Sequence, residues 1–141
     1  MLEKPKEELD EKIEGTPFTW RQALIQGKTG IIAIPTTQQH DNVVRQAVAL
    51  HPVYRLLGGF TITSWLRTPE HNKAIGGASA SSHLLGFATD FVPLHCSPDE
   101  ARAKIKQAGI YPGRTEIDAK TWVHLDLKNG VDFYARPTIK P

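Results

Sequence analysis

The stretch SSHLLGFATDFV, residues 81–92, carries the most information about the fold, because it brings an imidazole and a carboxylate into one loop that enters a β-strand. Successive side chains of a strand point to opposite faces, so Asp90 shares a face with Ala88, while Phe87 and Phe91 lie on the other. With these apolar neighbours, Asp90 is expected to be at least partly buried. A buried carboxylate requires a cation or strong hydrogen-bond donors.

A second strand is predicted over KTWVHLDL, residues 120–127, and its two faces differ in chemistry. One face is apolar and is expected to pack on the core: Val123, Leu125 and Leu127. The other face combines an aromatic ring, an imidazole and a carboxylate: Trp122, His124 and Asp126. Such a combination is more typical of the floor of a site than of a solvent-exposed surface.

Three of these polar groups can hold one metal ion between them. His83 can fold back over small residues to share a cation with Asp90 and His124. Two imidazoles and one carboxylate suit zinc, and a three-ligand site leaves the fourth position to water, which is the catalytic arrangement. The residues alone also permit a plainer alternative, in which Asp90 forms a buried ion pair with Arg67 or Arg55. His83 is then an ordinary loop residue.

The composition is that of one folded domain without disulfides. The chain has 141 residues, 40% hydrophobic and 23% charged, and these values fit neither a disordered chain nor a membrane protein. The single cysteine, Cys96, excludes an intrachain disulfide and a zinc site of the multi-cysteine type. A net charge of +2 without a basic cluster argues against a nucleic-acid partner.

Residues 1–15 are predicted to form a charged tail, and residues 16–141 a single domain. The tail carries six acidic residues and three lysines and has no apolar core, so it is not expected to be a signal peptide. No stretch approaches the roughly 20 apolar residues of a membrane-spanning helix, and membrane insertion is therefore not expected.

Caps and hydrophobic periodicity predict short helices and strands in the rest of the chain. Helices are expected over residues 18–27, 37–57 and 97–109. Pro52 is expected to kink or split the second helix, and Ser97 with Glu100 forms a capping box at the start of the third. Strands are expected over residues 60–65 and 120–127, the latter paired as a hairpin with residues 131–134.

Residues 81–90 match the pattern Ser-x-His-x-x-Gly-x-Ala-x-Asp. Together with WVHLD, residues 122–126, this string resembles the zinc D,D-peptidases of the M15 family, which are D-alanyl-D-alanine carboxypeptidases and endopeptidases. The resemblance extends through residues 60–78 and 18–24 and covers residues 16–136. It implies an α+β fold in which a small antiparallel sheet carries a zinc site and helices flank the sheet.

The resemblance also implies roles for single residues. The zinc ligands would be His83, Asp90 and His124. The reaction would be cleavage of peptidoglycan stem peptides or cross-links by zinc-activated water. Arg67 matches a substrate-binding arginine, which can clamp a terminal carboxylate or stabilise the oxyanion. Ser81 matches a serine that helps to hold the peptide, and Trp122 is expected to contact it from the floor of the site.

The catalytic carboxylate departs from the pattern of the family. Many members have Glu or Asp three residues before the last histidine ligand, where this chain has Thr121. Asp118 lies six residues before His124, at the offset where the related hedgehog signalling domains have Glu. Asp118 is therefore the first candidate and Glu116 the second. Asp126 is expected to orient an imidazole instead.

The leading hypothesis is a zinc-dependent peptidoglycan peptidase of the D,D-carboxypeptidase or endopeptidase type, and specifically a phage endolysin. Such a protein is made in the cytoplasm and reaches the wall through a pore formed by another protein. A bacterial wall-remodelling enzyme is the second version. The alternative class is a non-catalytic zinc-containing module that binds the cell wall or belongs to a virion. The sequence predicts neither the bond that is cleaved nor the oligomeric state.

Overall fold

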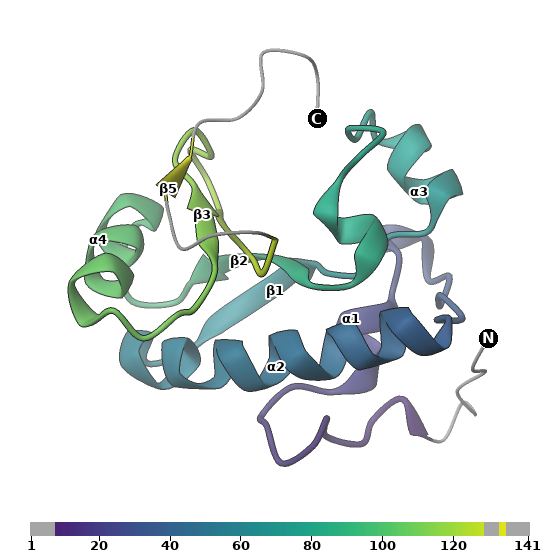
Figure 1. Ribbon diagram of the computed structural model, residues 1–141, viewed down its shortest axis with the longest axis horizontal. Coiled ribbons are helices and arrows are strands. Elements are labelled where there is room, and N and C mark those ends of the chain that lie inside the picture. The colour runs from purple at the N-terminus through teal and green to yellow at the C-terminus, as the bar shows by residue number, and fades with distance from the viewer. Residues whose placement is uncertain (1–7, 129–132, 135–141) are drawn as a thin grey trace.

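The computed structural model describes residues 8–128 and 133–134, which form helices at both ends and on one face of a small sheet (Figure 1). The helices are α1 (Trp20–Leu24), η2 (Gly27–Thr29), α2 (Thr37–Leu57), α3 (Pro69–Ala74), η3 (Ser82–Leu85) and α4 (Pro98–Ala108). The strands are β1 (Phe60–Ser64), β2 (Ala88–Pro93), β3 (Arg114–Glu116), β4 (Val123–Asp126) and β5 (Phe133–Tyr134). No helix among the described residues is both long and apolar enough to cross a membrane.

The sheet has the order β1-β2-β4-β3-β5, and its first four strands are antiparallel. The expected α+β fold with a small antiparallel sheet and flanking helices is confirmed. The expected hairpin is wrong, because β5 pairs in parallel with β3. Both edges of β4 are already occupied, by β2 and β3, so β4 has no edge left for β5. Val131 lies outside the described residues.

Helix α2 lies under the sheet and forms one wall of the core (Figure 1). Thr36 caps its start in a reciprocal capping box with Gln39, and Gly58 ends it in the left-handed conformation with φ of 69°. Pro52 lies inside the helix and does not split it into two. Gln46, fully buried on this helix, donates to the Leu125 carbonyl at 3.1 Å and so ties α2 to β4.

The N-terminal segment contributes to the core as far back as the structure describes it. Leu9 and Ile13 are 3% and 0% exposed and belong to the hydrophobic cluster. The Ile13 amide donates to the Phe18 carbonyl at 2.8 Å, which folds the segment back against α1. The predicted tail is therefore wrong for residues 8–15: their charged side chains point outward, but two apolar side chains anchor the segment. Residues 1–7 lie outside the described part.

Candidate active site and metal centre

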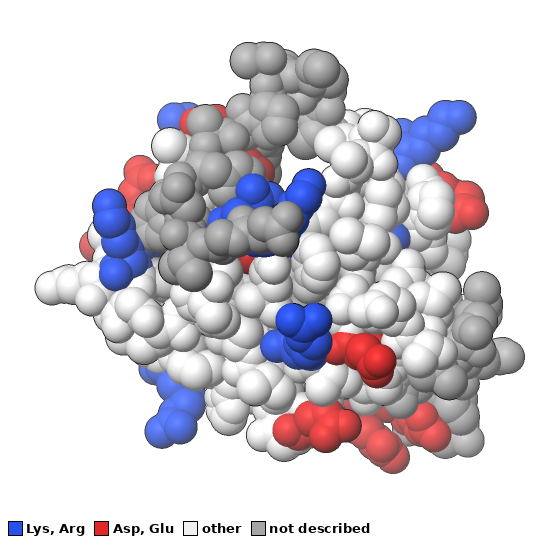
Figure 2. Space-filling view, in the orientation of Figure 1, with Lys and Arg blue, Asp and Glu red and all other residues white. Residues whose placement is uncertain are grey.

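A pocket of about 250 Å³ opens between the sheet and the loop that precedes β2. The sheet side of its lining includes Asp90, Arg114, Glu116, Trp122 and His124. The loop side includes Arg67, Ile75, Gly77, Ser81 and His83. In the space-filling view, Lys and Arg side chains border the hollow between the β3 end and the α3 side of the molecule (Figure 2). Of the residues that the sequence assigned to a site, Asp118 and Asp126 are absent from this lining.

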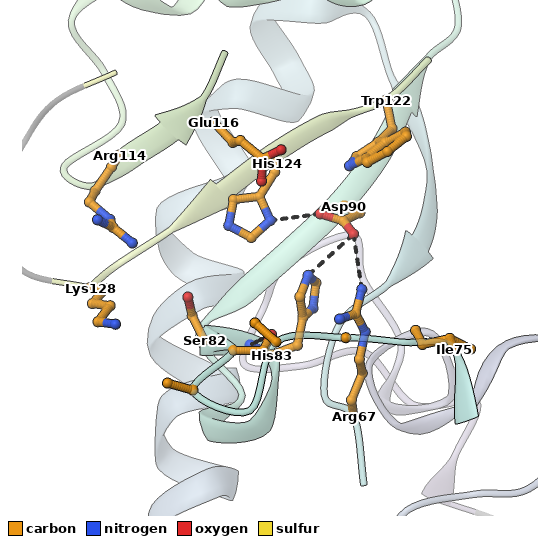
Figure 3. Close-up of a pocket in the computed structure, with 14 residues that line it drawn as sticks. Arg67, Ile75, Ser82, His83, Asp90, Arg114, Glu116, Trp122, His124 and Lys128 are labelled. Atoms are coloured by element: carbon orange, nitrogen blue, oxygen red, sulfur yellow. Dashed lines mark hydrogen bonds and ion pairs between the residues drawn. The ribbon is translucent and has the colours of Figure 1, made fainter. Parts of the chain in front are cut away.

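The predicted metal ligands come together at the bottom of this pocket (Figure 3). His83, Asp90 and His124 are all buried, and each offers a ligand atom within 4.8 Å of the others. Antiparallel pairing sets Asp90 directly opposite His124, and the Asp90 carboxylate lies 2.8 Å from His124 Nδ1. The other oxygen of Asp90 lies 3.2 Å from His83 Nε2.

His83 presents an unprotonated nitrogen to the centre. Its Nδ1 lies 2.7 Å from the carbonyl oxygen of Trp65, which only accepts, so the ring hydrogen is on Nδ1. Nε2 then carries a lone pair, and it is a buried atom without a hydrogen-bond partner in the described structure. Burial lowers the pKa of His83 and keeps the ring neutral. A buried acceptor left unpaired costs about 1–3 kcal/mol, a cost that a metal ion would remove.

His124 lies between two carboxylates. Its Nε2 donates to Asp126 at 2.7 Å, and its Nδ1 faces Asp90. Burial lowers the pKa of His124, but hydrogen bonds to Asp126 and Asp90 outweigh this effect and raise the pKa to about 9. Burial likewise opposes ionisation of Asp90, yet the protonated His124 beside it holds the pKa of this carboxyl well below the ordinary value. The position between Asp90 and His124 thus requires a cation, either a proton or a metal.

Asp126 anchors this arrangement from behind. Its carboxylate is completely buried and accepts from His124, from Arg114 Nε at 2.8 Å and from the Ser82 hydroxyl at 3.3 Å. With Nε2–H committed to Asp126, His124 can offer only Nδ1 to a metal. The donor set therefore fits zinc: two neutral imidazole nitrogens and one carboxylate, with each imidazole fixed by an oxygen acceptor on its other nitrogen.

Arg67 lies beside Asp90, but it does not replace the histidines as the partner of that carboxylate. Its Nη2 is 3.5 Å from Asp90, longer than either histidine contact. Its Nε donates to Ser64 and its Nη1 to Asn72, each at 3.2 Å. Arg55, the other candidate for a buried ion pair with Asp90, lies on α2 away from this pocket.

Asn72 is a site residue that the sequence did not reveal. It is 4% exposed, accepts from Arg67 and donates to the Ala78 carbonyl at 2.9 Å. The Gly77 amide donates to the Asn72 carbonyl, and a Cβ on Gly77 would lie only 2.0 Å from Asn72 Oδ1. Asn72 thus joins the arginine to the loop that walls the pocket. An asparagine within a polar helical turn gives no sequence signal of this role.

The two candidate catalytic carboxylates occupy different environments. Glu116 is 7% exposed, pairs in register with His124 and lines the pocket. Asp118 follows the end of β3, is exposed and is not part of the lining. Glu116 is therefore closer than Asp118 to the place where a substrate would bind, and the catalytic role of either carboxylate stays a prediction.

Ser81 and Trp122 line the pocket, as their assignment to substrate requires. The Ser81 hydroxyl also caps η3 by accepting from the His83 amide at 3.2 Å, so it orients the first ligand as well. The Trp122 carbonyl accepts from Arg102 at 3.2 Å, which holds the start of β4 against α4. Their contact with a peptide stays a prediction.

Comparison with protein families gives a match to one family model. The model described as Peptidase M15 matches residues 20–126, a span that includes α1, the whole antiparallel part of the sheet and every residue of the metal centre. Comparison with individually curated proteins finds no match.

Proposed function

The chain belongs to the peptidase M15 family, and from that premise we propose that it is a zinc-dependent peptidase acting on peptidoglycan. The bonds hydrolysed would be peptide bonds of stem peptides or cross-links, with D,D-carboxypeptidase or endopeptidase specificity. One observation carries the proposal: the buried His83 nitrogen has no hydrogen-bond partner among the described residues, and it faces Asp90 and His124 at the bottom of an open pocket.

The zinc would be held by His83 through Nε2, by the Asp90 carboxylate and by His124 through Nδ1. Zinc in such a three-ligand site supplies Lewis acidity, which activates water and polarises a carbonyl group. Binding would displace the proton that Asp90 and His124 share. The Trp65 carbonyl and Asp126 would keep both imidazoles in the orientation they already have.

Glu116 is the proposed proton carrier. From its place opposite His124 it would accept a proton from the attacking water and deliver it to the leaving amine. Arg67 would stabilise the negative charge that develops on the scissile carbonyl oxygen, because its guanidinium is already held beside Asp90 by Ser64 and Asn72. Trp122 and Ile75 would contact the apolar parts of the peptide.

Hydrolysis of purified peptidoglycan with and without a chelator tests this function. Fragments released by the zinc-loaded protein would disappear with chelator and return with added zinc, and their masses would name the bond. Intact peptidoglycan, with a protein shown to hold one zinc, would favour the wall-binding or virion module. The endolysin role is tested separately, by comparing lysis of cells that express the protein with and without a pore-forming partner.

A further inference from the structure

The basic side chains of the pocket lie on two sides of the metal centre. Arg67 lies on the loop side, and Arg114 and Lys128 lie on the side formed by β3 and the end of β4 (Figure 3). Both arginines are already bound to carboxylates of the protein: Arg67 to Asp90 at 3.5 Å, and Arg114 to Asp126 at 2.8 Å. Both guanidinium groups therefore already have partners within the protein and hold the site in shape.

Lys128 differs from the two arginines. Its backbone amide donates to Asp126 at 3.0 Å, which fixes the base of the side chain beside the metal centre. The side chain is exposed and lines the pocket. Among residues 8–128 and 133–134, no ion pair or hydrogen bond engages its ammonium. Lys128 is thus a cation at the pocket wall that is not committed to a described carboxylate.

The charge balance of the occupied site favours an anionic group at this place. A divalent ion held by two neutral imidazoles and one carboxylate keeps a net positive charge. The opposite, loop wall carries one cation, Arg67, which already faces Asp90 at 3.5 Å, and its lining also includes Ile75, Gly77, Ala78 and Ala80. Among the lining residues that the structure describes, Lys128 is the cation without a carboxylate partner, so a substrate carboxylate would meet an uncommitted cation on the Lys128 side.

We propose that this pocket selects peptides with a free carboxylate on the residue that lies on the Lys128 side of the scissile bond, and that the Lys128 ammonium binds it. The inference rests on the proposed peptidase function and deepens it, because it names a chemical feature of the substrate. It also separates two tasks that the sequence assigned jointly to Arg67: the arginine supports the reacting carbonyl, and Lys128 binds the carboxylate.

A set of matched peptides tests the proposal. The parent is the stem peptide L-Ala-γ-D-Glu-L-Lys-D-Ala-D-Ala, in which D-Glu is linked through its side-chain carboxyl. In two derivatives, either the free D-Glu α-carboxylate or the terminal carboxylate is replaced by a carboxamide. With the zinc-loaded protein, the carboxamide at the position that Lys128 contacts should lower kcat/KM about tenfold, and the other carboxamide should have little effect. The loss should come mainly from a higher KM, as expected when a charge-assisted contact is removed. In Lys128→Met this preference disappears, in Lys128→Arg it persists, and in Lys104→Met, an exposed lysine on α4, it is unchanged.

An undiminished preference in Lys128→Met, or equal rates for all three peptides with the wild-type protein, would overturn the inference while leaving the peptidase function intact. If no peptide is hydrolysed, calorimetric titration of the same peptides into zinc-loaded Glu116→Gln protein measures binding alone. A carboxylate preference in binding that depends on Lys128 would support the inference even if no peptide were hydrolysed. Equal affinity of the carboxylate and carboxamide peptides would contradict it.

Discussion

The two walls of the pocket are built in different ways. On the sheet wall, Asp90, His124 and Glu116 occupy paired positions of three neighbouring strands, so backbone hydrogen bonds set their spacing. On the loop wall, Arg67 is held by side-chain contacts to Ser64, Asn72 and Asp90, and the His83 ring by its contact with the Trp65 carbonyl. Side chains on the sheet wall should therefore keep their positions when a neighbouring side chain is changed. Side chains on the loop wall should shift when one of their hydrogen bonds is removed.

The largest effect is expected on the sheet wall at Glu116. Glu116→Gln removes the proposed proton carrier but keeps the shape of the side chain, so kcat should fall by about 10²–10⁴-fold with zinc content unchanged. The matched control is Asp118→Asn, which should change kcat less than about twofold because Asp118 lies outside the pocket. Steady-state kinetics and metal analysis of both variants decide between the two carboxylates, and the reverse pattern would return the role to Asp118.

A smaller effect is expected behind the sheet wall at Asp126. Asp126→Asn weakens the acceptor that fixes His124, so zinc affinity should fall about 10–100-fold. Competition with a chromophoric chelator measures the affinity, and Asp41→Asn, an exposed change on α2, is the control. Because Asp126 also binds Arg114, thermal unfolding must show that the variant is folded. Zinc affinity equal to that of the control would contradict the orienting role.

The smallest of these effects is expected on the loop wall at Asn72. Asn72→Ala leaves the Ala78 carbonyl and one Arg67 nitrogen without their partner, so the free energy of unfolding should fall by about 1–3 kcal/mol. kcat should fall about tenfold with zinc content unchanged, since Arg67 loses its orientation. Denaturant titration and kinetics measure the two effects. An unchanged kcat with a raised KM would mean that Asn72 shapes the pocket without positioning Arg67.

The sheet wall was predictable because strand alternation is a local property of the sequence. The pattern around Asp90 and His124 indicated which side chains share a face. The resemblance of residues 81–90 to the family indicated that they bind the same zinc ion. Alternation could not be carried from Glu116 to Asp118, because β3 ends at Glu116 and the chain then turns away. The offset of a related family therefore favoured Asp118, whereas the strand pairing favours Glu116.

The loop wall and the N-terminal segment were harder to predict. The contact of His83 with the Trp65 carbonyl spans 18 residues, and no local pattern encodes it. The same holds for the bridge that Asn72 makes between Arg67 and the Ala78 carbonyl. In the N-terminal segment the high charge obscured Leu9 and Ile13, both of which are buried in the core.

Zinc titration of the metal-free protein tests the central claim most directly. Calorimetry and native mass spectrometry should give one zinc per chain for the wild-type protein and for His71→Ala, whose histidine lies on α3 outside the pocket. His83→Ala should remain folded and bind no zinc at the same concentrations, because it lacks the nitrogen that faces Asp90 and His124. Stoichiometric zinc in folded His83→Ala, or none in the wild-type protein, would contradict the account.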